Sequence, residues 1–80
     1  MKIQVLFFGM ARDLIGKSTI EFELGSNLSI NELENLIRLK FPKFVELKNY
    51  SIAVNEEYVD ENYTIQNMDV VAIIPPVSGG

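Results

Sequence analysis

Residues 68–74 read Met-Asp-Val-Val-Ala-Ile-Ile, a nearly unbroken apolar run that Pro75 and Pro76 end. Proline has no backbone N–H to donate to a strand ladder, so the run is bounded on that side. A strand that is apolar on both faces is typical of the middle of a sheet. We therefore expect residues 68–74 to form a central strand.

The beginning of the chain contains a second run of this kind. Residues 3–8 read Ile-Gln-Val-Leu-Phe-Phe, and Gly9 ends the run. The two most apolar segments of a small sheet are expected to lie side by side at its centre. They can pair in parallel, because the connection between them is long and contains a helix.

The clearest helix signal begins at Ser29. Glu32 follows three residues later, so the hydroxyl and the carboxylate can reciprocally satisfy free backbone donors. Pro42 opposes further propagation of the helix. Between these limits, apolar residues recur at helical spacing: Ile30, Leu33, Leu36, Ile37 and Phe41. The sequence predicts a helix over residues 30–41.

The remaining elements are shorter. Residues 10–15 are compatible with a short helical turn closed by Gly16, and residues 19–24 alternate in polarity as an edge strand with one wet face does. After an irregular stretch, residues 50–54 alternate again, Asn55 permits a tight turn, and residues 58–59 start a short return strand. Residues 62–68 are expected to form a loop or a single helical turn.

This order of elements indicates an α+β fold of the β-grasp (ubiquitin-like) type, with a mixed sheet and one main helix across one face. We expect residues 1–74 to form the domain and residues 75–80 a flexible tail. If Ile3, Val5 and Phe7 point towards the helix, Leu6 and Phe8 point away from it, and one parity of residues 70–74 must do the same. The outer face is then an apolar surface that either a partner or side loops cover.

Composition excludes many functions. The chain has 80 residues and no cysteine or histidine, so thiolate metal sites, disulfides and the usual general base are absent. Its net charge of −4 opposes binding to nucleic acid. The first apolar run is too short for a signal peptide or a membrane span, and we expect a cytoplasmic protein.

The last six residues are the most informative for function. Pro75 and Pro76 direct the chain out of the sheet, and Val77 to Gly80 offer too little apolar surface to fold back. Gly79 and Gly80 have no side chains, so this end can thread a narrow channel. A terminal diglycine on a β-grasp domain fits a reagent that is inserted into the active site of another protein.

At this point the chain resembles a known family, the small sulfur-carrier subunits of molybdopterin synthase, among the ubiquitin-like sulfur carriers. The resemblance covers the whole chain, and its most specific part is the ending Pro-Pro-Val-Ser-Gly-Gly. One departure is Ile73-Ile74, where an aromatic residue is expected in relatives. The stretches that carry the resemblance are residues 5–8, Ala11-Arg12-Asp13-Leu14 closed by Gly16, Val54-Asn55-Glu56-Glu57-Tyr58-Val59, and residues 69–80.

The resemblance implies a chemistry. An ATP-dependent activating enzyme adenylates the carboxylate of Gly80, a sulfur donor enzyme converts it to a thiocarboxylate, and the large synthase subunit uses the sulfur to convert cyclic pyranopterin monophosphate to molybdopterin. The resemblance also implies that the chain itself binds no cofactor or metal and has no catalytic machinery of its own. The family assembles two small and two large subunits into a heterotetramer. Gly79 and Gly80 would enter the active site, and the resemblance points to Phe8, Tyr58, Ile74, Pro75, Pro76 and Val77 as partner contacts.

Other interpretations stay open from the residues. The chain is also compatible with a sulfur carrier for thiamine or tRNA thiolation, or with a ubiquitin-like protein modifier. Arg12 is expected to be a solvated charge rather than a contact. The acidic residues Glu56, Glu57, Asp60 and Glu61 are expected to form a solvated edge rather than a calcium site.

Overall fold

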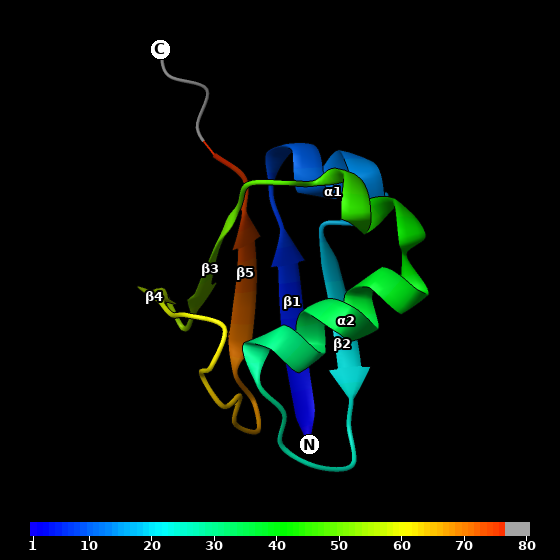
Figure 1. The fold of residues 1–80 in the computed structure, drawn as a ribbon. Coiled ribbons are helices and arrows are strands. Elements are labelled where there is room, and N and C mark those ends of the chain that lie inside the picture. Colours follow the sequence, from blue (N-terminus) through cyan, green and yellow to red (C-terminus); the bar gives the residue numbers. More distant parts are fainter. Residues whose placement is uncertain (77–80) are drawn as a thin grey trace.

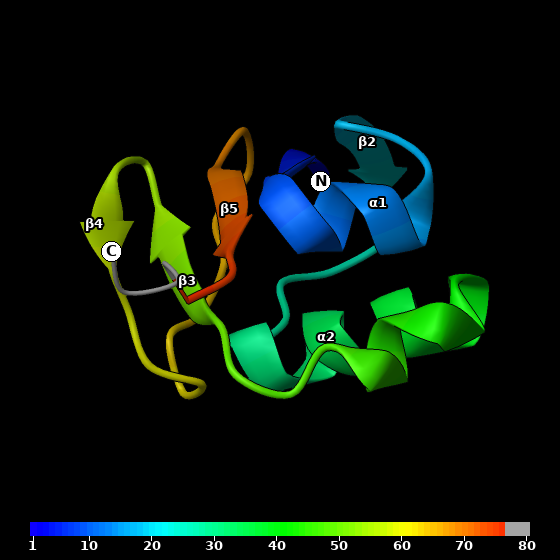
Figure 2. The ribbon, with the colours of Figure 1, turned by 90° about the horizontal axis from the view of Figure 1, so that it is seen from above.

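The computed structural model describes residues 1–76 and confirms the β-grasp architecture: a five-stranded mixed sheet with α2 across one face (Figures 1 and 2). The strand order is β2-β1-β5-β3-β4. None of the helices within this range is long and apolar enough to cross a membrane. The elements are β1 (Lys2–Phe7), α1 (Gly9–Ile15), β2 (Thr19–Glu23), α2 (Ile30–Lys40), the 3-10 helix η1 (Pro42–Glu46), β3 (Ser51–Val54), β4 (Glu57–Tyr58) and β5 (Val70–Ile74).

The two apolar runs lie side by side at the centre of the sheet as predicted, but β5 begins at Val70, two residues later than the predicted strand. β1 and β5 are neighbours and run parallel, with Val5 opposite Val71 and Phe7 opposite Ile73. β2 is an edge strand that pairs with β1 in antiparallel orientation, and β3 pairs with β5 in the same orientation. The carboxyl ends of β1 and β5 therefore meet at one end of the sheet, where the chain leaves the domain.

The inner face of the sheet and α2 enclose the core. Val5, Phe7, Val71 and Ile73 are buried beneath the helix. The capping box forms as predicted, because the Ser29 hydroxyl accepts from the Glu32 N–H and the Glu32 carboxylate accepts from the Ser29 N–H. Other fully buried core side chains are Ile3, Ile30, Leu33, Ile37, Phe44 and Ile65.

Several boundaries differ from the prediction. β1 ends at Phe7, and Phe8 is the extended residue that precedes α1 rather than the last residue of the strand. α1 extends from Gly9 to Ile15, and Gly16 caps its carboxyl end. Gly16 has a φ of 83°, in the left-handed region that glycine adopts without a steric penalty. The stretch expected to be irregular contains η1, which begins at Pro42 and buries Phe44. Tertiary contacts with the core, which the local sequence does not show, stabilise this turn.

Candidate functional site

The outer face of the sheet carries an apolar row that crosses four strands. Leu6 lies opposite Ala72, Ala72 opposite Ala53, and Ala53 opposite Tyr58. Directly opposed residues share a face, so all four belong to the face away from α2. The small alanines between Leu6 and Tyr58 leave a shallow groove, which is lined by Leu6, Phe8, Ala53, Asn55, Glu56, Tyr58, Val70, Ala72 and Ile74.

This groove continues to the point where the chain leaves the sheet. Phe8 and Ile74 line both the outer groove and a second hollow at the end of β5, which Pro75 and Pro76 also line. The Phe8 N–H donates to the Ile73 carbonyl at 3.3 Å, which holds the start of α1 beside β5. Phe8 and Ile74 therefore join the outer groove to the hollow beside Pro75 and Pro76.

The structure brings together most of the residues that the sequence singled out. Phe8 is 48% exposed and Tyr58 73% exposed, so both are available at the surface, whereas Ile74 is half-buried. The parity argument is confirmed, because Leu6, Val70, Ala72 and Ile74 alternate with buried neighbours. Pro75 is half-buried and Pro76 is exposed. Val77, Gly79 and Gly80 lie outside the described residues.

A polar cluster that sequence reasoning missed adjoins the groove through Asn55. Asp69 is 6% exposed and accepts hydrogen bonds from Asn55 Nδ2 at 2.9 Å, the Tyr63 hydroxyl at 3.1 Å and the Gln66 N–H at 2.8 Å. Burial and the adjacent Asp69 carboxylate raise the pKa of the Tyr63 hydroxyl. The one signal in the sequence is an acidic residue placed directly before a buried strand, where a carboxylate needs partners.

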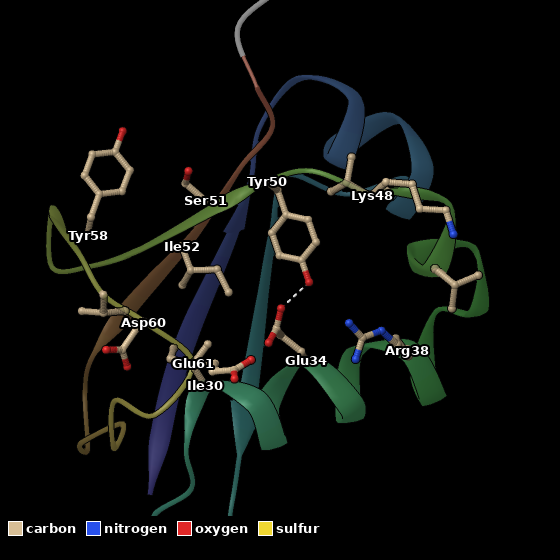
Figure 3. Close-up of a pocket in the computed structure, with 13 residues that line it drawn as sticks. Ile30, Glu34, Arg38, Lys48, Tyr50, Ser51, Ile52, Tyr58, Asp60 and Glu61 are labelled. Atoms are coloured by element: carbon tan, nitrogen blue, oxygen red, sulfur yellow. Dashed lines mark hydrogen bonds between the residues drawn. The ribbon is translucent and has the colours of Figure 1, made fainter.

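A third hollow lies on the helix side of β3 (Figure 3). The Tyr50 hydroxyl donates to the Glu34 carboxylate within it, and the Phe44 and Tyr50 rings lie 5.4 Å apart. Burial, and then the hydrogen bond to Glu34, raises the pKa of Tyr50. Arg38 and Asp60 give this hollow both signs of charge. We interpret the Tyr50 and Glu34 pair as a structural link between α2 and the residue that precedes β3.

The charged residues define no further site. Glu56, Glu57, Asp60 and Glu61 are all exposed, as expected for a solvated edge, and Arg12 is exposed as well. Within residues 1–76, no group of three or more acidic, histidine or cysteine side chains could hold a metal ion. The apolar outer face and the chain end beside it therefore form the candidate functional site.

The fold and this surface define a ubiquitin-like β-grasp protein with an apolar face beside its last strand. The ThiS family matches residues 5–80. Two curated relatives, both molybdopterin synthase sulfur carrier subunits, are 36% identical. The relative from Arabidopsis thaliana aligns over 100% of this chain and 84% of its own length. That from Chlamydomonas reinhardtii aligns over 100% of both chains. The chain belongs to the ThiS family.

Solved structures agree with this assignment. A Pyrococcus furiosus protein assigned as subunit 1 of molybdopterin converting factor superposes with a TM-score of 0.88 at 30% identity, covering 96% of this chain and 99% of its own. In a complex of subunits 1 and 2 of the Helicobacter pylori factor, the matching chain superposes with a TM-score of 0.73 at 27% identity, and the match covers 100% of both chains. Small archaeal modifier protein 1 from Haloferax volcanii superposes with a TM-score of 0.85 at 13% identity, covering 95% of this chain and 98% of its own. At this low identity the match shows the fold alone.

Proposed function

We propose that this protein is the sulfur-carrier subunit of a molybdopterin synthase. The observation that carries the proposal is that the apolar outer face adjoins Pro75 and Pro76, where the chain leaves the sheet. Phe8 and Ile74 line both the outer groove and the hollow beside these prolines. A partner that covers this face is placed to receive the residues that follow Pro76. The names of the relatives and the Helicobacter pylori complex of two subunits support the same assignment.

The proposed chemistry takes place at the carboxylate of Gly80. A carboxylate is a poor electrophile, and this chain has no cysteine or histidine with which to activate it. We therefore assign activation to a separate enzyme: the carboxylate attacks the α-phosphorus of ATP, pyrophosphate leaves, and an acyl adenylate forms. Hydrosulfide supplied by a donor enzyme then attacks the carbonyl carbon and loses its proton, and AMP leaves, so that the terminal carboxylate becomes a thiocarboxylate. We further propose that these steps take place in the cytoplasm, where ATP is abundant.

The product of these steps is a thiocarboxylate, which is an anionic and soft nucleophile. In the active site of the large subunit its sulfur attacks a side-chain carbon of cyclic pyranopterin monophosphate and displaces the oxygen substituent of that carbon. Hydrolysis of the resulting thioester leaves sulfur on the pterin and regenerates the Gly80 carboxylate. Two such transfers build the dithiolene of one molybdopterin. In this scheme the chain supplies the reagent and the docking surface, and the two large subunits of a heterotetramer supply the catalytic groups.

Intact mass spectrometry tests the proposal directly. Incubation with the activating enzyme, ATP and a sulfide source is expected to add a mass equal to sulfur minus oxygen, located at Gly80 by fragmentation. Addition of the large subunit and the pterin substrate is then expected to yield molybdopterin and return the original mass. A matched variant with one alanine appended after Gly80 is expected to remain unmodified.

Two results would overturn the proposal. The thiocarboxylate could form but transfer its sulfur to a thiazole synthase or to tRNA in place of the pterin, which would assign the chain to another sulfur-transfer pathway. Alternatively, Gly80 could become linked through an amide bond to lysines of other proteins. That result would assign it to the protein modifiers, with which it shares its fold.

A further inference from the structure

The turn between β3 and β4 has a backbone conformation that its sequence does not favour by itself. Asn55 has a φ of 51° and Glu56 a φ of 72°. Asparagine tolerates this left-handed region, but a glutamate at the second position is uncommon, since glycine is the usual residue there. Contacts outside the turn must therefore stabilise it.

Those contacts come from Asn55, which makes three hydrogen bonds to Asp69 and to Val70, the first residue of β5. Its N–H donates to the Val70 carbonyl at 2.9 Å, its Oδ1 accepts from the Val70 N–H at 3.0 Å, and its Nδ2 donates to Asp69 Oδ1 at 2.9 Å. The second oxygen of Asp69 accepts from the Tyr63 hydroxyl and from the Gln66 N–H. Both carboxylate oxygens are thus occupied, and the cluster ties the turn to the loop before β5.

The conformation of this turn also determines the position of Tyr58, which lines one side of the outer groove. β4 has only the residues Glu57 and Tyr58, and it pairs with β3 at Ala53 and Val54. So short a strand is weakly determined by its own ladder. Tyr58 stands opposite Ala53 and is 73% exposed, so its position over the groove depends on how the hairpin is held.

We propose that Asp69, Asn55 and Tyr63 form a hydrogen-bonded latch that positions the β3-β4 hairpin, and with it Tyr58, for docking of the partner subunit. The three latch residues act through the hairpin and are positioning residues. The inference rests on the proposed function, because it takes the outer face as the surface that the large synthase subunit covers.

The hydrogen-bond pattern allows the side chains of Asp69 and Asn55 to be swapped by mutation. In Asp69→Asn, the new amide group must face one of three donors, so at least one hydrogen bond is lost. In the double variant Asp69→Asn, Asn55→Asp, the new amide group at position 69 can donate to the carboxylate at position 55, while the amide oxygen accepts from Tyr63 and Gln66. The other oxygen at position 55 still accepts from the Val70 N–H. The exchange conserves net charge, and aspartate also tolerates the left-handed region.

Hydrogen exchange tests the latch in the free protein. The reporters are the Val59 N–H, which donates to the Ile52 carbonyl at 3.0 Å, and the Asn55 N–H; the Phe7 N–H, bonded to Ser18 at the far side of the sheet, is the control. In Asp69→Asn, exchange at Val59 and Asn55 is expected to accelerate while that at Phe7 is unchanged, and the double variant is expected to restore protection. Equal acceleration at all three amides would overturn the latch. Tyr63→Phe, which removes one bond, provides a milder form of the test if Asp69→Asn does not fold.

Calorimetric titration with the large subunit tests the link to docking, using variants shown to be folded. Asp69→Asn is expected to weaken binding about tenfold, as loss of one well-placed interface tyrosine does. In a Tyr58→Ala background, the same substitution is expected to change affinity by less than about twofold, because the residue that the latch positions is already gone. Asp13→Asn, the same chemical change at an exposed site on α1, is the matched control.

The outcomes separate the two proposals. Additive effects of Asp69→Asn and Tyr58→Ala, or no rescue of affinity by the double variant, would overturn the latch while the proposed function stands. Failure of the unmodified protein to bind the large subunit would overturn the proposed function instead.

Discussion

Replacement of Phe8 by aspartate is the sharpest test of the outer face. Phe8 is the residue before α1, with an extended backbone (φ −115°, ψ 154°) and no side-chain capping bond. Aspartate is a preferred residue at such a position and can accept a hydrogen bond from the first turn of the helix, which contributes about 1 kcal/mol. This gain offsets part of the loss of the buried half of the ring, so Phe8→Asp is expected to fold.

The loss of affinity follows from the exposed half of the ring. Phe8 is 48% exposed, which for a phenylalanine amounts to roughly 100 Å². If a partner covers this area, its burial contributes about 2.5 kcal/mol at about 25 cal/mol per Å², or roughly 70-fold in Kd. The introduced carboxylate would also lose its water without gaining a partner, so the total loss is larger.

The assay is calorimetric titration of each folded variant with the large synthase subunit. Leu39→Asp is the matched control, since Leu39 is 79% exposed on α2, the helix that covers the opposite face of the sheet. We expect Phe8→Asp to abolish measurable binding and Leu39→Asp to leave it unchanged. If Phe8→Asp binds within about threefold of the unmodified protein, a range that corresponds to roughly 0.6 kcal/mol, the outer face is not the docking surface.

Three further predictions concern the chain end, α2 and Tyr50. Deletion of Gly79 and Gly80 is expected to weaken binding to the large subunit only slightly while eliminating molybdopterin formation; loss of binding in titration would instead make the chain end the anchor. Ser29→Ala removes the capping bond and is expected to lower the free energy of unfolding in urea by about 1 kcal/mol. Because the pKa of Tyr50 is raised in the folded protein, the unfolded chain releases that proton first, and stability is expected to fall as pH rises above about 10. In denaturant titrations, the free energy of unfolding of Tyr50→Phe should fall less between about pH 9 and 11 than that of the unmodified protein. An equal fall in both proteins would exclude Tyr50 as its source.

Much of the fold could be predicted because its signals are local. The capping box at Ser29 and Glu32, the helical spacing up to Phe41 and the two apolar runs each depend on residues within a few positions of one another. The parity of β1 follows from the two-residue repeat of a strand, so the outward direction of Leu6 could be predicted from the sequence. The chemistry assigned to Gly80 comes from the resemblance of the stretch Pro-Pro-Val-Ser-Gly-Gly to a known family and stays a prediction.

The tertiary structure alone decided which residues meet across the outer face. The row from Leu6 to Tyr58 exists only because the register aligns four strands, and Ala53 and Ala72 become the floor of a groove only between larger side chains. Asp69 is a stronger case, because its partner Asn55 lies 14 residues away and is brought to it by the pairing of β3 with β5. A local pattern fixes the type of an element and the face of each side chain. Contacts between distant residues depend on the register and packing of the whole sheet, which no short stretch of sequence contains.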